Sequence, residues 1–273
     1  MIKTVTVSVN DFFGWKNHPF SDLADQNDEI MVKHDQEVLR RAVELLKIGK
    51  SFAITGGSGL GKTTLARAII KAIDPRNYQL LWVPYTGANR GGILRMLAEK
   101  TGIELTRKGL PPVAKLQKHI ATEQKERGAP FPIIVVDDAQ HLENESLTDL
   151  CAMLISPEEN RTIMAIILVG DEMLDRTLRL TSQKAVSSRL ACVFKMKSLA
   201  QDDAKAMLNF RMEKAKAPGN PFDREAMEIN TANRGNRREL RSWHLIYAWR
   251  HILEMKVITS EMILSTEYMQ ANG

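Results

Sequence analysis

The chain has 273 residues, of which 44% are hydrophobic, and this suits one large globular domain or two modest ones. Its longest strongly apolar run, residues 163–169, is far shorter than the roughly 20 residues of a membrane-spanning helix, so we expect a soluble cytoplasmic protein without a membrane span. The 38 Lys and Arg against 33 Asp and Glu give a formal net charge of +5, which favours an anionic partner such as nucleic acid without requiring one.

The N-terminal segment is dominated by aromatic side chains. Residues 1–10 alternate between polar and apolar, as in an edge strand or a disordered tail, and residues 12–20 then bring four aromatic side chains close together. Such a cluster must be buried, either over the base of a bound nucleotide or in an ordinary core. Residues 35–48 follow, with apolar side chains on one face of a predicted helix.

The stretch that organises the chain is a G-x-x-x-x-G-K-[ST] sequence between an apolar run at residues 51–55 and a helical pattern at residues 64–73. A strand, a glycine-rich loop and a helix in this order are typical of a phosphate loop, whose backbone N–H groups face phosphate oxygens. Lys62 would reach the β- and γ-phosphates of ATP, and the Thr63 hydroxyl would hold Mg²⁺. The residues expected to bind the nucleotide are Gly56, Gly57, Ser58, Gly59, Leu60, Gly61, Lys62, Thr63 and Thr64.

Positive charges follow the next predicted strand, residues 79–83. A loop at residues 84–92 leads from this strand to a helix at residues 93–101, and a second helix follows at residues 113–127. Loops after the carboxyl ends of parallel strands are where such sheets bind ligands. The basic residues expected to contact DNA are Arg90, Arg107, Lys108, Lys115 and Lys118. A solvated loop and a solvated helix face explain the same charges, and both explanations stay open here.

A run of apolar, mostly β-branched residues at 132–136 ends in two acids, Asp137 and Asp138. A run of this kind without alternation predicts a strand that is buried on both faces, as in a parallel sheet. Because parallel strands end at the edge where the phosphates bind, Asp137 would organise Mg²⁺ and Asp138 would orient or deprotonate the attacking water. The alternative role of these acids is to cap the helix that follows.

The rest of the chain divides into an α/β part and a helical part. A helix at residues 145–155 and a strand at residues 162–169 complete the first part, and Asp171 is expected to cap a helix at residues 172–180. From residue 199 onward the pattern predicts helices alone, at residues 201–216, 223–229 and 236–255 and after residue 260. We therefore expect an α/β nucleotide-binding domain at residues 1–198 and a helical lid domain at residues 199–273.

Together these motifs resemble a family, the AAA+ ATPases of the ExeA type (general secretion pathway protein A) and the related transposition ATPases of the TnsC, TniB and MuB kind. The resemblance spans roughly residues 11–265. It rests on Phe12-Phe13-Gly14, Pro19-Phe20, His34, the phosphate loop, Val136-Asp137-Asp138-Ala139-Gln140, Leu168-Val169-Gly170, Ser188-Arg189-Leu190 and Gly235-Asn236-Arg237-Arg238. It implies an α/β P-loop NTPase (AAA+) fold, in which helices flank a parallel sheet and a C-terminal α-helical lid follows.

The resemblance also implies roles for two arginines. Arg189 would be the arginine finger that enters the ATP site of a neighbouring subunit, and Arg238 would be the sensor-2 arginine of the lid. Arg238 lies in a basic segment at the start of a predicted helix, where positive charge is unfavourable for the helix dipole and invites an anionic partner. Two positions depart from the family pattern: Asp138 replaces a glutamate, so hydrolysis is expected to be slow, and the sensor-1 position falls on or near Asp171 and stays unassigned.

These observations favour an ATP- and Mg²⁺-dependent regulator of DNA transposition. An ATP-bound homo-oligomer, either a ring or a helical filament, would assemble on double-stranded DNA with little sequence preference, recruit a transposase and disassemble on hydrolysis. The alternative is an ExeA-like, secretion-associated ATPase that acts on a protein or membrane partner. A metabolic P-loop kinase is disfavoured because no small-molecule acceptor site is evident. Subunit number, partner protein and target-site preference do not follow from the sequence.

Overall fold

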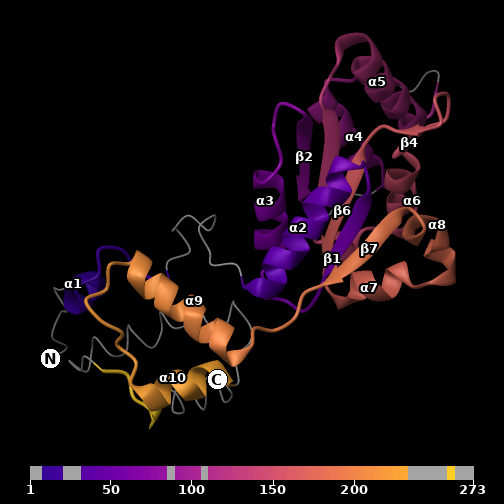
Figure 1. Cartoon of the computed structure of the whole chain (residues 1–273). Coiled ribbons are helices and arrows are strands. Elements are labelled where there is room, and N and C mark those ends of the chain that lie inside the picture. Colours follow the sequence, from indigo (N-terminus) through magenta and orange to yellow (C-terminus); the bar gives the residue numbers. More distant parts are fainter. Residues whose placement is uncertain (1–7, 21–31, 85–89, 106–109, 233–256, 262–273) are drawn as a thin grey trace, which may run out of the picture. The chain divides into compact units, whose positions relative to one another are not determined.

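The computed structural model describes residues 8–20, 32–84, 90–105, 110–232 and 257–261, and the chain forms two compact units. The first is an α/β unit made of residues 33–57 and 62–196. The regular elements of the second unit are helices, and its described residues are 8–20, 32, 58–61, 197–232 and 257–261. Figure 1 shows both units and labels many of their elements.

The α/β unit is built on five parallel strands in the order β2-β3-β6-β1-β7 (Figure 1). The strands are β1 (Ser51–Thr55), β2 (Tyr78–Pro84), β3 (Phe131–Asp137), β6 (Ala165–Gly170) and β7 (Leu190–Lys195). Every residue of β1 and β6 is buried, as expected of inner strands that are covered on both faces. The expected parallel sheet, which positions the phosphate loop at its carboxyl edge, is confirmed.

Helices cover both faces of this sheet. On one face, α2 (Lys33–Lys47) and α3 (Lys62–Lys71) pack against β1 and each other. On the other face, a core is enclosed by α4 (Arg90–Thr101), α5 (Pro112–Arg127), α6 (Asn144–Ala152), α7 (Glu172–Leu178) and α8 (Lys184–Ser187). Ala53 and Val136 point into this core, whereas Phe52 and Ile54 face α2 and α3 because side chains alternate along a strand.

Two parts of the α/β unit differ from expectation. Residues 155–162, expected to end a helix and begin a strand, instead form a hairpin of β4 (Ile155–Ser156) and β5 (Arg161–Thr162). Asn160, with a positive φ of 49°, turns the chain between them. The sequence analysis did not predict β7, because this edge strand is only partly buried and lacks the signature of an inner strand. Two short 3-10 helices, η2 (Ala139–His141) and η3 (Thr181–Gln183), complete the unit.

The helical unit contains the N-terminal aromatic segment. Its helices are α1 (Val9–Phe13), α9 (Gln201–Lys214) and α10 (Arg224–Ala232). The rings of Phe13 and Trp15 stack with centroids 4.5 Å apart, and both side chains are buried with Met207 and Leu208 of α9. The backbone N–H of Lys16 donates to the Ala215 carbonyl at 3.0 Å. The aromatic cluster is therefore part of a core, which was one of the two alternatives.

This arrangement differs from the expected domains at two places before residue 197, because the N-terminal segment and residues 58–61 of the phosphate loop both group with the helical unit. The sequence analysis assigned residues 1–198 to the α/β domain, but the described residues 8–20 pack with the helices that follow residue 197. The reason is that aromatic side chains must leave water, and α9 offers them an apolar face. Residues 9–13 form a helix, although residues 9 and 10 belong to the segment expected to be an edge strand or a disordered tail. The Ser8 side chain caps this helix by accepting a hydrogen bond from the Asp11 N–H.

Some expectations concern residues that the structure does not describe. The helix expected at residues 236–255, the sensor-2 candidate Arg238 and the basic residues Arg107 and Lys108 all lie outside the described ranges. Within the described ranges, no helix is long and apolar enough to cross a membrane.

Candidate nucleotide-binding site

The phosphate loop connects the end of β1 to the start of α3. Gly59 and Gly61 have φ values of 78° and 82°, a left-handed conformation that is costly for residues with a Cβ atom. Helix α3 begins at Lys62, so its first N–H groups and its positive dipole end adjoin the loop. This backbone has the properties of an anion site.

Lys62 is the cation of the loop. Its ammonium group donates a hydrogen bond to the backbone carbonyl of Gly57 at 2.8 Å, so the side chain folds back over the loop from which it comes. The residue is half-buried, and part of its environment is therefore shielded from water. The arrangement holds one positive charge beside the backbone N–H groups that would face phosphate oxygens.

Thr63 and Asp137 join the loop to the neighbouring part of the sheet edge. The Thr63 hydroxyl donates to Asp137 Oδ1 at 3.2 Å, although 74 residues separate them. A hydroxyl and a carboxylate are oxygen ligands of the kind that Mg²⁺ prefers, and in phosphate-loop proteins the nucleotide supplies further ligands. Among the described residues, no group of three His, Cys, Asp or Glu side chains could hold a metal ion. The Thr63 hydroxyl and the Asp137 carboxylate fit a magnesium ion whose other ligands would come from a bound nucleotide.

The electrostatic environment of Asp137 suits the same role. Burial raises the pKa of its carboxyl group above the usual value for Asp, and the nearby Asp138 charge acts in the same direction. Hydrogen bonds from Thr63 and from the Asp138 N–H, together with the charge of Arg67, oppose this rise only in part. A carboxylate that is short of compensating positive charge is a good partner for a cation.

Asp138 follows in a left-handed backbone conformation, with φ 52° and ψ 39°. Although it stands before η2, its side chain makes no capping hydrogen bond there. Its Oδ1 instead accepts a hydrogen bond of 3.2 Å from the Gln140 side-chain amide. The helix-capping alternative therefore does not describe this carboxylate, which is exposed at the carboxyl edge of the sheet.

The end of β6 lies beside this pair. Gln140 Oε1 accepts a hydrogen bond of 3.1 Å from the Asp171 N–H, and Asp171 Oδ1 accepts one of 2.7 Å from the Met173 N–H. Asp171 is thus the N-cap of α7, as expected from the sequence.

Arg189 lies at the opposite edge of the sheet. It occupies the exposed turn between α8 and β7, and the next residue, Leu190, pairs with Ser51 at the start of β1. Since the phosphate loop follows the other end of β1, the turn and the loop are about 15 Å apart, the length of a five-residue strand. An arginine side chain does not span that distance. Arg189 therefore does not reach the phosphate loop of its own chain.

The surroundings of Arg189 include a buried thiol on α6. Burial raises the pKa of Cys151 to about 12, against an opposing effect of the Arg189 charge. Cys151 is thus an unreactive core residue.

The structure describes only part of the expected DNA-contacting set. Lys115 and Lys118 lie three residues apart on α5, whose opposite face buries Leu116 and Ile120. Lys118 is exposed, and Lys115 is half-buried. Arg90 begins α4, but its side chain is not described, and Arg107 and Lys108 lie outside the described residues. A common basic face remains a prediction.

Two residues near the site were not assigned roles from the sequence. The Arg67 guanidinium lies 5.6 Å from the centre of the Trp82 ring, and its charge partly opposes the rise in the pKa of Asp137. Arg67 is four residues after Thr63, one helical turn along the same face of α3, so this spacing could have indicated it. Gln140 follows the two acids closely, but only the fold reveals its second partner on β6.

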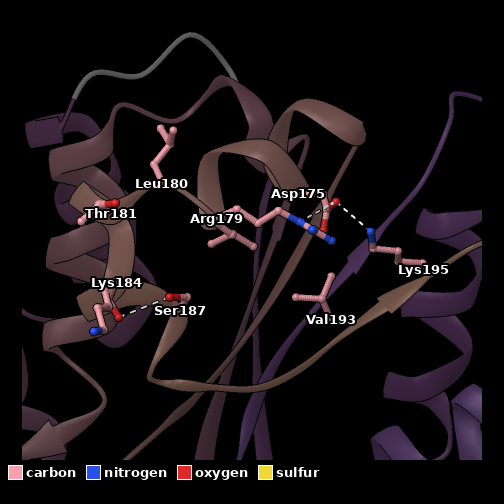
Figure 2. A pocket seen from close by; sticks show the side chains of 9 residues that line it. Asp175, Arg179, Leu180, Thr181, Lys184, Ser187, Val193 and Lys195 are labelled. Atoms are coloured by element: carbon pink, nitrogen blue, oxygen red, sulfur yellow. Dashed lines mark hydrogen bonds and ion pairs between the residues drawn. The ribbon is translucent and has the colours of Figure 1, made fainter.

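A basic pocket of about 650 Å³ lies along the edge strand β7 (Figure 2). Its lining includes three basic side chains, Arg179, Lys184 and Lys195, and a single carboxylate, that of Asp175. Asp175 accepts a hydrogen bond from Lys195 at 2.8 Å and forms an ion pair with Arg179 at 3.2 Å. Partial burial tends to raise the pKa of Asp175, but these two cations outweigh that effect and lower it. The pocket thus has a net positive charge that no sequence motif indicated.

Comparison with known proteins identifies the α/β unit. Residues 48–178 match the AAA domain family. General secretion pathway protein A of Aeromonas hydrophila is 22% identical over 206 residues, which are 75% of this chain. The chain spans only 37% of the length of that relative.

Solved structures agree on the fold. Cdc6p of Pyrobaculum aerophilum superimposes with a TM-score of 0.67 at 16% identity, covering 88% of this chain and 67% of that one. The ORC1 protein of Aeropyrum pernix, in complex with DNA, gives 0.66 at 16% identity, with 90% and 68% covered. The RuvB branch migration motor of Thermotoga maritima gives 0.56 at 16% identity, with 88% and 70% covered. Residues 48–178 are therefore similar to the AAA domain family, the α/β unit has a P-loop NTPase fold of the AAA+ kind, and the chain is distantly similar to general secretion pathway protein A.

Proposed function

We propose that this protein is a Mg²⁺-dependent ATPase that uses ATP binding and slow hydrolysis as a switch. The observation that carries the proposal is the 3.2 Å contact between Thr63 Oγ1 and Asp137 Oδ1, directly beside the phosphate loop. The AAA domain match supports nucleotide binding.

Each residue at the carboxyl edge has a role in this proposal. Lys62 would exchange the Gly57 carbonyl for the β- and γ-phosphates, and Thr63 and Asp137 would hold Mg²⁺. The ion, when bound, neutralises negative charge on the phosphate oxygens. Asp138 orients the attacking water and accepts its proton. An aspartate is one methylene shorter than the glutamate of the ExeA-like pattern, and for this reason we expect slow turnover.

Completion of the site would require a second subunit. Arg189 would reach the nucleotide of a neighbouring chain in a homo-oligomer, either a ring or a filament, and neutralise charge that develops during hydrolysis. Arg238 would report on the γ-phosphate from the lid. Both roles come from the resemblance to AAA+ ATPases, and the remoteness of Arg189 from its own phosphate loop is consistent with the first.

The switch is proposed to act on a protein partner in the cytoplasm, as part of a secretion system. The kinship with general secretion pathway protein A, over 75% of this chain, favours this candidate over the transposition function expected from the sequence. Because the chain corresponds to 37% of that relative, the partner and the substrate of the relative are not carried over.

A second candidate is the DNA-bound oligomer that recruits a transposase. The formal charge of +5 and the exposed Lys118 on α5 favour it, and the similar Aeropyrum pernix ORC1 structure is a complex with DNA. A DNA contact of this kind would be made to the phosphate backbone, so that it would be salt-sensitive and largely independent of sequence.

Two measurements test these proposals. Calorimetry and phosphate release, each with and without Mg²⁺, should detect ATP binding and slow hydrolysis, and the absence of both would overturn the ATPase switch. Fluorescence anisotropy with a random-sequence duplex and a non-hydrolysable ATP analogue then separates the partners. ATP-dependent binding that is weakened by Lys115→Glu with Lys118→Glu would favour the DNA candidate. No binding at low salt would eliminate it and leave the protein partner.

A further inference from the structure

We propose that Gln140 is a positioning residue, which orients the carboxylate of Asp138 and ties it to the end of β6. The inference rests on the proposed ATPase function, in which Asp138 acts on the attacking water. It concerns a side chain that would not touch the nucleotide and acts through its neighbours.

Both ends of the Gln140 amide group are used. Nε2 donates to Asp138 Oδ1 at 3.2 Å, and Oε1 accepts from the Asp171 backbone N–H at 3.1 Å. The partners determine which end is which, since a carboxylate can only accept and a backbone N–H can only donate. Glutamine is therefore the side chain of this length that can satisfy both partners at neutral pH.

The anchor of this bridge is fixed by its own surroundings. Asp171 caps α7, and its Oδ1 accepts a hydrogen bond from the Met173 N–H at 2.7 Å, which holds the backbone where it meets Gln140. Gly170 leaves the space that the amide oxygen occupies. A Cβ atom at Gly170 would lie 2.9 Å from Gln140 Oε1 and 2.8 Å from the Leu174 Cβ, both too close.

Asp138 needs such a partner because its own position constrains it weakly. The residue is exposed, and its side chain makes no capping hydrogen bond to η2. A short carboxylate with free rotamers would spend little time in one orientation toward a water molecule. The hydrogen bond from Gln140 limits that freedom, and orientation of a catalytic group is a large part of its effect on rate.

The first test compares Gln140→Met with Gln140→Glu. Methionine has a similar size but neither donates nor accepts strongly, and glutamate can still accept from Asp171 but cannot donate to Asp138. Both variants should lower kcat for ATP hydrolysis by roughly 10- to 100-fold, the range for loss of a hydrogen bond to a charged group, with KM and ATP affinity within about twofold of wild type. Glutamate should have the larger effect because it adds a like charge.

The matched control is Gln124→Met. Gln124 also ties a helix to the backbone near β6, since its amide donates to the Ile163 carbonyl at 2.7 Å, but Ile163 precedes the strand and lies at the other edge. This variant should lose a similar amount of thermal stability while kcat stays at the wild-type value. Equal kcat losses in Gln124→Met and Gln140→Met would reduce Gln140 to a structural role and overturn the proposal.

A second readout does not depend on turnover. The side-chain amide signals of Gln140 in an NMR spectrum, assigned by their loss in Gln140→Met, should shift in Asp138→Asn and not in the exposed control Asp202→Asn. Unchanged signals in Asp138→Asn would overturn the bridge even if the protein hydrolyses ATP. If wild type neither binds nor hydrolyses ATP, the proposed function fails, whereas the NMR result still decides whether Gln140 holds Asp138.

Discussion

The two edges of the central sheet differ in how their polar residues are held. At the carboxyl edge, side chains from separate elements contact one another, as Thr63 does with Asp137 and Gln140 with Asp138. At the other edge, Arg189 stands in an exposed turn. The carboxyl edge is thus assembled within one chain, whereas the arginine is available to a neighbour. From this difference we expect that a single chain binds ATP, whereas full hydrolysis requires two chains.

Of the substitutions at the carboxyl edge, Lys62→Ala is expected to have the largest effect on ATP binding. The substitution removes the cation aimed at the β- and γ-phosphates, so ATP affinity should fall roughly 100-fold or more, and turnover with it. Calorimetry gives the affinity. Lys71→Ala, at the exposed far end of the same helix, is the control and should bind ATP normally. An unchanged affinity in Lys62→Ala would remove the lysine from the site.

A substitution at the other edge should impair hydrolysis and assembly rather than ATP binding. Arg189→Ala should keep its ATP affinity but lose about 10³-fold in hydrolysis and fail to assemble, since an arginine finger acts across a subunit interface. Phosphate release and sedimentation with ATP measure the two losses. Arg176→Ala, an exposed arginine of α7, should behave as wild type. Intact assembly and hydrolysis in Arg189→Ala would show that the assignment is wrong.

A mixture of the two variants sharpens the comparison between the edges. Lys62→Ala subunits retain Arg189, and Arg189→Ala subunits retain the ATP site. In a mixed oligomer, some interfaces would therefore pair an intact ATP site with an intact Arg189. Phosphate release should therefore exceed the sum of the separate variants. If the mixture gives only that sum, the two edges do not meet between subunits.

A smaller effect is expected at Asp138. Asp138→Asn should leave ATP binding intact and slow hydrolysis by about 10- to 100-fold, because the amide cannot accept the proton of the attacking water. Single-turnover phosphate release measures this step. Hydrolysis at the wild-type rate would remove Asp138 from the mechanism.

The smallest expected effect concerns the stability of the nucleotide-free protein. Because the folded-state pKa of Asp137 is raised, its charged form is disfavoured by folding. The protonated Asp137 carboxyl group therefore stabilises the folded protein. This contribution is fully present at pH values below the pKa of Asp137 in the unfolded chain, and it is lost as pH rises through the pKa of Asp137 in the folded protein. Asp137→Asn should therefore unfold at higher urea concentration than wild type at pH 7, and this advantage should shrink as pH falls. The same variant should lose Mg²⁺-dependent ATP binding.

Local patterns were sufficient to predict the phosphate loop, the inner strands and the cap at Asp171. Each is encoded within a short contiguous segment, in which neighbours along the chain determine backbone conformation. The position of Asp137 beside the loop also followed, because parallel strands share a carboxyl edge. DNA contacts and the roles of Arg189 and Arg238 stay predictions.

Only the tertiary structure decided the contacts between distant segments. Gln140 contacts Asp171 across 31 residues, and the N-terminal aromatic cluster packs on α9, more than half of the chain away in sequence. The positions of the edge strand β7 and of the basic pocket beside it likewise depend on which segment pairs with the outer side of β1. A single sequence specifies that aromatic rings must be buried and amide groups paired, but several partners satisfy those requirements. Which partner is used depends on packing across the whole fold.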